Sequence, residues 1–126
     1  MSDRPLVLVA EDDEDILLLV ATRLERDGFD VVTARSGEEA LAIAQEQRPA
    51  VAVLDIGMPP PDGIEVVRRI RTDEQLRSMQ LLLLTAKAQE TDVRRGFEAG
   101  ADAYIRKPFS PAELTERVRA LLAIRD

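Results

Sequence analysis

The sequence predicts an α/β fold: a doubly wound parallel sheet of five strands with helices on both faces. Short apolar runs, typical of strands buried on both faces, alternate five times with segments of helical periodicity. Such alternation favours a parallel sheet with right-handed crossovers. A chain of 126 residues is the usual size of one domain, and no linker, low-complexity segment or repeat divides it. We therefore expect a single domain over residues 1–126, with no second domain visible.

The first strand is predicted at Leu6–Ala10, and the first helix at Ile16–Leu24, ending at Gly28. Five acids, Glu11–Asp15, stand between them. Acids near a helix N-terminus favour its dipole and cap its first turn, which accounts for two or three of the five. A dinucleotide-binding turn would be rich in glycine here, whereas carboxylates repel phosphate unless a cation intervenes. The second strand, Phe29–Ala34, follows.

The middle of the chain holds the second helix, the third strand and the third helix. Ser36 and Glu39 form a capping box for a helix that ends near Gln47. Val51–Leu54 has the length and branching of a buried strand, and Pro59–Pro61 prevents it from continuing. The third helix has an apolar face and a solvated side: Ile64, Val66, Val67 and Ile70 form the first, and Arg68, Arg69 and Arg71 the second.

The last part of the chain repeats the pattern twice. Leu81–Leu84 is a buried strand, and Val93 and Phe97 lie four apart on a helix that Gly100 terminates. Ala103–Arg106 is a short fifth strand. The final helix begins with a cap and a capping box and continues with an apolar face: Ser110, Pro111 and Glu113, then Leu114, Val118, Leu121 and Leu122.

Composition excludes several classes of function. The chain has no cysteine, and therefore no disulfide framework or thiol nucleophile. It has no histidine, which excludes Ser-His-Asp triads and a phosphohistidine on this chain. The net charge of -7 argues against nucleic-acid binding through this domain. Without a membrane span or signal peptide, we expect no membrane partner and a cytoplasmic location.

Polar or charged residues follow four of the predicted strands. In an open parallel sheet, reactive groups collect at the carboxyl ends of the strands, where the strand order reverses. Taken singly, each residue has a structural explanation, as a turn-initiating acid, a strand-end hydroxyl or an exposed lysine. Together they are expected to meet in one crevice: Glu11 and Asp12, Asp55, Thr85, and Lys107.

Three carboxylates in one crevice repel one another and would be protonated or displaced unless a cation lies among them. Ligands that are all oxygen point to a hard ion, Mg²⁺, with Mn²⁺ as the alternative. With such an ion bound, Asp55 can attack phosphorus as a carboxylate nucleophile. The Lys107 ammonium and the Thr85 hydroxyl are then suited to stabilise the oxygens of the transferred group.

The sequence resembles the receiver domain of bacterial two-component response regulators over essentially the whole chain. The motifs that carry the resemblance lie in the family's order and spacing: Glu11-Asp12, Asp55 in Leu-Asp-Ile-Gly-Met-Pro, Asp62-Gly63, Thr85-Ala86, and Tyr104 followed by Lys107-Pro108-Phe109.

The resemblance implies a flavodoxin-like (βα)5 fold with strand order 2-1-3-4-5. It implies that Asp55 takes phosphate from a histidine kinase or a histidine phosphotransfer protein. Mg²⁺ would be held by Asp12, Asp55 and the Gly57 backbone carbonyl, with Glu11 nearby. A cis bond before Pro108 would direct Lys107 into the crevice.

The resemblance also implies a switch rather than an enzyme, although the domain assists its own phosphorylation and dephosphorylation. Thr85 would move toward the phosphoryl group and Tyr104 would turn inward, remodelling the face of the fourth helix, fifth strand and fifth helix. That face would control a protein partner or a missing output domain. Family dimers carry crossed ion pairs on this face. Arg117, Arg119, Glu98 and Glu113 fit the pattern and Val93 and Ala103 do not, so we expect a monomer or a weak phosphorylation-dependent dimer.

Two other classes of function compete with this interpretation. An aspartate-nucleophile phosphohydrolase typically needs a second acid two residues after the nucleophile, where this chain has Gly57. A receiver-shaped interaction module that is never phosphorylated would have no use for the full set of site residues. A further hypothesis is that Gly57 and Lys87, near the crevice mouth, affect the hydrolysis of the aspartyl phosphate.

Overall fold

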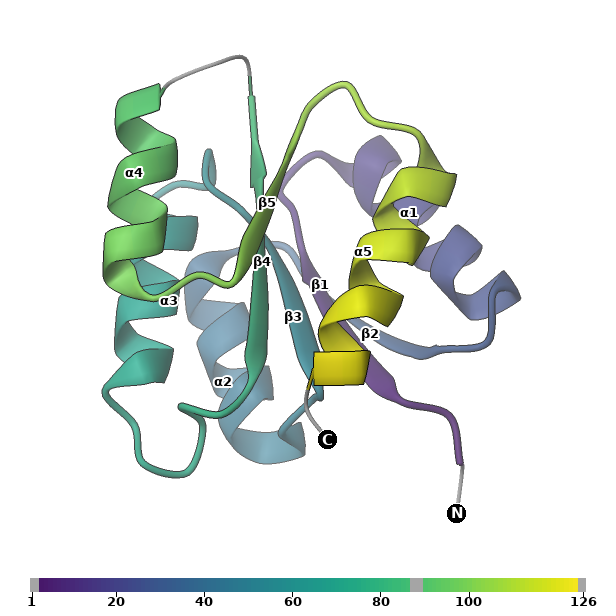
Figure 1. Cartoon of the computed structure of the whole chain (residues 1–126), viewed down its shortest axis with the longest axis horizontal. Coiled ribbons are helices and arrows are strands. Elements are labelled where there is room, and N and C mark those ends of the chain that lie inside the picture. Colours follow the sequence, from purple (N-terminus) through teal and green to yellow (C-terminus); the bar gives the residue numbers. More distant parts are fainter. Residues whose placement is uncertain (1–2, 87–89, 125–126) are drawn as a thin grey trace.

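The protein is a doubly wound parallel sheet in the order β2-β1-β3-β4-β5, which confirms the predicted fold class and strand order (Figure 1). The computed structural model describes residues 3–86 and 90–124. The strands are β1 (Leu6–Ala10), β2 (Asp30–Ala34), β3 (Val51–Asp55), β4 (Gln80–Thr85) and β5 (Ala103–Arg106). The helices are α1 (Glu14–Arg26), α2 (Gly37–Gln47), α3 (Gly63–Arg71), α4 (Glu90–Ala99) and α5 (Pro111–Ile124).

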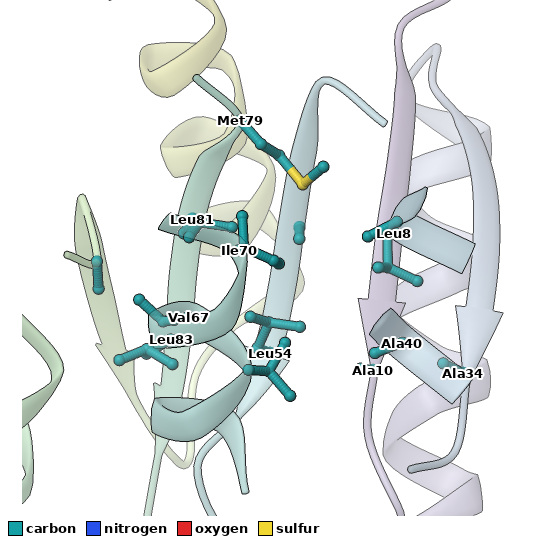
Figure 2. Close-up of a cluster of buried hydrophobic side chains, with 14 of the residues drawn as sticks. Leu8, Ala10, Ala34, Ala40, Leu54, Val67, Ile70, Met79, Leu81 and Leu83 are labelled. Atoms are coloured by element: carbon teal, nitrogen blue, oxygen red, sulfur yellow. The ribbon is translucent and has the colours of Figure 1, made fainter. Parts of the chain in front are cut away.

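The helices divide between the two faces of the sheet. Figure 1 shows α2, α3 and α4 on one face and α1 and α5 on the other. Side chains alternate along each strand, so Leu8 of β1 packs under α2 and α3 while Val7 and Val9 pack under α1 and α5. The first of these two clusters is drawn in Figure 2, where Leu54, Val67 and Ile70 approach one another from the sheet and α3. Both faces of the central strands are therefore core.

Strand register brings distant parts of the chain to one edge of the sheet. Ala10 lies beside Leu54, Asp55 beside Leu84, and Thr85 beside Arg106. Because all five strands run parallel, the residues that follow these positions emerge together, at the upper edge in Figure 1. This edge is where the sequence placed the crevice.

Side-chain caps start α2 and α5 where the sequence predicted them, and α1 two residues earlier. The Ser36 hydroxyl accepts a hydrogen bond from the Glu39 amide at 3.1 Å, and the Ser110 hydroxyl accepts one from the Glu113 amide at 3.1 Å. Asp13 caps α1 by accepting from the Asp15 and Ile16 amides. One of the five clustered acids is thus a cap, and Glu14 and Asp15 occupy the first turn, where they favour the helix dipole.

The sequence predicted Arg71 on the solvated side of α3, and this prediction is wrong. Its guanidinium donates to the carbonyl oxygens of Gly100 and Met79 at 2.8 and 2.6 Å and pairs with Asp102 at 2.7 Å. The side chain is only 20% exposed. It crosses the end of α3 and ties it to the turns before β4 and β5, whereas Arg68 and Arg69 are exposed as expected.

Arg119 does not belong to the set of charges expected on the α4, β5 and α5 face. It donates to the Asp27 carbonyl oxygen at 2.9 Å and lies 5.8 Å from the centre of the Phe29 ring, on the α1 side of α5. Lys87, the subject of the hydrolysis hypothesis, lies outside the described residues. Within 3–86 and 90–124, no helix has the length and apolar character needed to cross a membrane.

Candidate functional site

Asp55 is the last residue of β3 and is 4% exposed. The Ile56 amide continues the strand by donating to the Leu84 carbonyl oxygen at 2.9 Å, so the chain is held in the sheet just past Asp55. The carboxylate itself accepts from the Gly57 amide at 3.2 Å. A buried aspartate at the end of a central strand is thereby fixed in direction as well as in position.

Two further acids meet Asp55 from β1. One oxygen each of Glu11, Asp12 and Asp55 lie within 4.8 Å of one another. Glu11 is 1% exposed and Asp12 is exposed, so the group has a buried wall and an open side. The Glu11 amide donates to the Ala34 carbonyl oxygen at 3.0 Å, which extends the pairing of β1 with β2 and fixes the first acid of the group.

Lys107 inserts its ammonium between two of these carboxylates. Its Nζ lies 2.9 Å from Glu11 Oε2 and 3.2 Å from Asp55 Oδ1. The Lys107 amide donates to the Thr85 carbonyl oxygen at 2.7 Å, which continues the pairing of β5 with β4. The peptide bond between Lys107 and Pro108 is cis, as the family resemblance implied. Residues far apart in sequence thus form one charged pocket.

Burial and mutual charge shift the protonation of this pocket. Burial raises the pKa of Glu11 to about 7, against the lowering effect of the Lys107 ammonium, which lies 2.9 Å away. Burial acts to lower the pKa of Lys107, but its close contact with Glu11 and the charge of Asp55 outweigh this, and the pKa is raised. Of this pair, Lys107 therefore keeps its charge more readily than Glu11 does.

The donor set fits a hard divalent cation. All the converging ligand atoms are carboxylate oxygens, and the described residues of the pocket include no sulfur or imidazole donor. Asp12 provides an open side on which an ion can keep water ligands, as Mg²⁺ prefers. An ion would also offset the repulsion between Asp55 and Glu11 that helps to raise the Glu11 pKa.

Thr85 is buried next to the pocket, whereas Tyr104 is partly exposed outside it. Thr85 ends β4, is 2% exposed, and its hydroxyl donates to the Ala86 carbonyl oxygen at 3.0 Å. Tyr104, on β5, is 38% exposed and meets Phe97 of α4 edge to face, with ring centres 5.6 Å apart. The structure brings Glu11, Asp12, Asp55, Thr85 and Lys107 to one edge of the sheet, and it places the Tyr104 ring outside the pocket.

An apolar groove, which the sequence did not reveal, opens beside the pocket. It has a volume of about 530 Å³ and reaches from α1 to the turn before α5, with Ile16, Leu19, Ala86, Lys107, Pro108 and Phe109 as its lining. Leu19 is 53% exposed, and its neighbour Leu18 is 67% exposed. The available signal was the consecutive leucines at 17–19, because a helix that buries one face needs no apolar residue on the other.

The chain is similar to receiver domains throughout its length. The family model described as "Response regulator receiver domain" matches residues 7–119. The alkaline phosphatase synthesis transcriptional regulatory protein PhoP of Bacillus subtilis (strain 168) is 47% identical over 116 residues, which cover 92% of this chain and 48% of that protein. Transcriptional regulatory protein SrrA of Staphylococcus aureus (strain NCTC 8325 / PS 47) is 42% identical over 116 residues, covering 92% and 47%. The chain spans about half the length of these curated relatives.

Solved structures agree with the sequence relatives. A putative response regulator from Chloroflexus aurantiacus J-10-fl superposes with a TM-score of 0.92 at 34% identity, covering 96% of this chain and 99% of that one. The receiver domain of the Francisella response regulator 1452 superposes with a TM-score of 0.88 at 35% identity, covering 98% and 100%.

Proposed function

The chain belongs to the response regulator receiver domain family, and from this premise we propose that Asp55 is its phosphoacceptor. The observation that carries the proposal is the buried Asp55 carboxylate, grouped with two other acids and 3.2 Å from a lysine ammonium. Asp12, Asp55 and the Gly57 carbonyl would hold Mg²⁺, with Glu11 beside them. Residues 1–126 would act as one receiver domain.

Each side chain has a part in the transfer. An Asp55 carboxylate oxygen attacks the phosphorus of a phosphohistidine on the donor protein, the P–N bond breaks, and its electron pair stays on the imidazole nitrogen. Bound Mg²⁺ would neutralise charge on the phosphoryl oxygens. The Lys107 ammonium turns from Glu11 to another phosphoryl oxygen, and the Thr85 hydroxyl gives up Ala86 to reach a third.

The donor is a histidine kinase or a histidine phosphotransfer protein. The groove beside the pocket supports this, because its apolar wall adjoins Lys107 and can bury apolar side chains of a partner that presents its histidine to Asp55. On phosphorylation, Thr85 and Tyr104 would rearrange the surface of α4, β5 and α5. That surface would control a protein partner in the cytoplasm or an output segment such as those of transcriptional regulatory proteins.

Incubation with Mg²⁺ and acetyl phosphate tests the proposal by intact-protein mass spectrometry. We expect one phosphoryl group per chain, lost in Asp55→Asn and without Mg²⁺. It should be retained in Asp15→Asn, which removes an exposed acid three residues from Asp12. Multiple turnover of varied phosphoesters would instead indicate a phosphohydrolase, and no labelling would indicate an interaction module.

A further inference from the structure

The loop between β3 and α3, residues 56–62, is held from three sides. The Met58 side chain is 3% exposed and lies in the core cluster under α3. At the α3 end, a Cβ on Gly63 would come within 2.8 Å of the Asp55 carbonyl carbon, so the start of α3 lies directly against the end of β3. The third contact comes from α2, which has no part in the site so far described.

Gly37, the first residue of α2, lies against the backbone of this loop. A Cβ on Gly37 would collide with the Pro61 carbonyl oxygen and would stand 2.8 Å from Pro61 Cγ and 3.0 Å from the Pro61 carbonyl carbon. Two of these three atoms are backbone and cannot rotate away. Gly37 is buried and has no positive φ, so space rather than backbone conformation requires glycine. Alanine would suit the helix better.

The three prolines of the loop limit its capacity to absorb a displacement. Pro59, Pro60 and Pro61 each have φ restricted by the ring, which leaves this stretch few ways to bend locally. Gly57 and Met58 directly precede them, and the Gly57 amide binds the Asp55 carboxylate. A shift imposed at Pro61 is therefore expected to move the Gly57 backbone relative to Asp55.

We propose that Gly37 is a positioning residue for the divalent-cation site. By leaving room for Pro61, it sets the position of the stiff loop, and through it the position of the Gly57 carbonyl beside Asp55 and Asp12. This inference rests on the proposed function, since it takes that carbonyl as a ligand. Gly37 itself touches neither cation nor phosphate.

Mg²⁺ affinity, measured by isothermal titration calorimetry, tests the inference. We expect Gly37→Ala to weaken Mg²⁺ binding about tenfold, as is typical when a support of a metal ligand is changed. Ala44→Gly, a change at a buried position two turns further along α2, is the matched control and should stay within about twofold. Equal affinities in wild type and Gly37→Ala, or an equal loss in the control, would overturn the inference.

A second substitution that loosens the loop distinguishes an effect on the cation site from a general loss of stability. In the Gly37→Ala background, Pro60→Gly should restore part of the Mg²⁺ affinity, because the loop can then bend around the new methyl group. Absence of recovery argues against transmission through the prolines.

A second variant decides if Gly37→Ala does not fold, as judged by circular dichroism. Pro60→Gly alone should weaken Mg²⁺ binding about two- to fivefold, and unchanged affinity overturns the inference. No Mg²⁺ binding by the wild type would instead overturn the proposed function.

Discussion

The pocket has two flanks of different construction. The β3 flank, residues 55–63, is buried at Asp55, Met58 and Gly63, and it leaves no room for a Cβ where α2 begins at Gly37 and α3 begins at Gly63. The β5 flank, formed by Tyr104 and Phe97, exposes 38% and 43% of these residues and joins them by one edge-to-face contact. The β3 flank is built to keep one geometry, whereas the β5 flank has room to adopt another.

This difference separates two requirements of a receiver. Ligands of a cation must keep their geometry, because a loose site loses affinity. A signalling surface must have a second arrangement of similar free energy, because a partner can only respond to a change in population. On the proposed function, the first requirement falls to a proline-rich loop that Met58 anchors in the core, and the second to an aromatic pair at the surface.

The largest expected effect is on the β3 flank. Met58→Ala should lower the free energy of unfolding by about 2–5 kcal/mol, because it removes a buried side chain and leaves a cavity. Urea denaturation, followed by circular dichroism, measures the change. A cost below about 1 kcal/mol, similar to that of an exposed side chain, would contradict the claim that this flank is the fixed one.

The next effect in size is the pH dependence that Glu11 contributes. Its pKa is about 7 in the folded protein, against 4.5 for an ordinary glutamate, so folding favours the protonated carboxyl. Its contribution is therefore fully present below pH 4.5 and is lost as pH rises to about 7, by an amount on the order of 3 kcal/mol. The measurement is the unfolding free energy of wild type minus that of Glu11→Gln, without Mg²⁺, between pH 4.5 and 8.

Added Mg²⁺ should reverse this trend, because binding to the ionised group stabilises the folded state more at pH 8 than at pH 5. A wild-type minus Glu11→Gln difference that does not vary with pH would show that burial does not control this carboxyl.

A smaller effect is expected at the turn after α4, where Arg71 of α3 binds the Gly100 carbonyl. Arg71→Ala removes hydrogen bonds to the Gly100 and Met79 carbonyls and should cost about 1–3 kcal/mol. Hydrogen exchange at the Ala101 amide, which donates to the Gly96 carbonyl, should speed up with it. Arg68→Ala, an exposed arginine on the same helix, is the control; equal effects of the two would mean that Arg71 anchors nothing.

The smallest effect on stability is expected on the β5 flank. Phe97→Ala should cost less than about 1 kcal/mol, because the ring is 43% exposed. It should change the intrinsic fluorescence, which reports on Tyr104 alone, since the chain has one tyrosine and no tryptophan. Beryllofluoride with Mg²⁺, a phosphoryl mimic, should alter this fluorescence in the wild type and not in Thr85→Ala. An unchanged signal in the wild type would mean that Tyr104 does not respond.

The architecture was predictable from the sequence because its signals are local. Short apolar runs such as Leu81–Leu84 favour a buried strand by their length, and caps such as Ser110 mark a helix start by their own hydrogen bonds. The convergence of Asp55, Thr85 and Lys107 followed from topology, since parallel strands end at a common edge. The contacts at that edge confirm the convergence but do not test the roles proposed for these side chains.

Other features depend on contacts that no local pattern contains. Arg71 follows Arg68 and Arg69 in a run that suggests solvent, yet its partners Gly100 and Asp102 come from a turn 29 and 31 positions away. Gly37 stands at a helix start, where its absence of a side chain has an ordinary explanation, and only the fold brings Pro61 against it. Packing of this kind is decided by tertiary structure alone.

The ammonium of Lys107, held between Glu11 and Asp55, has a consequence for the timing of signalling. It serves as an internal counter-ion, so the acids stay together before any donor arrives. On the proposed function, the positive charge that stabilises the phosphate is already inside the protein, and the ammonium has only to turn toward it. The Lys107 ammonium can then reach the phosphoryl oxygens by rotation of its own side chain, without a rearrangement of the backbone.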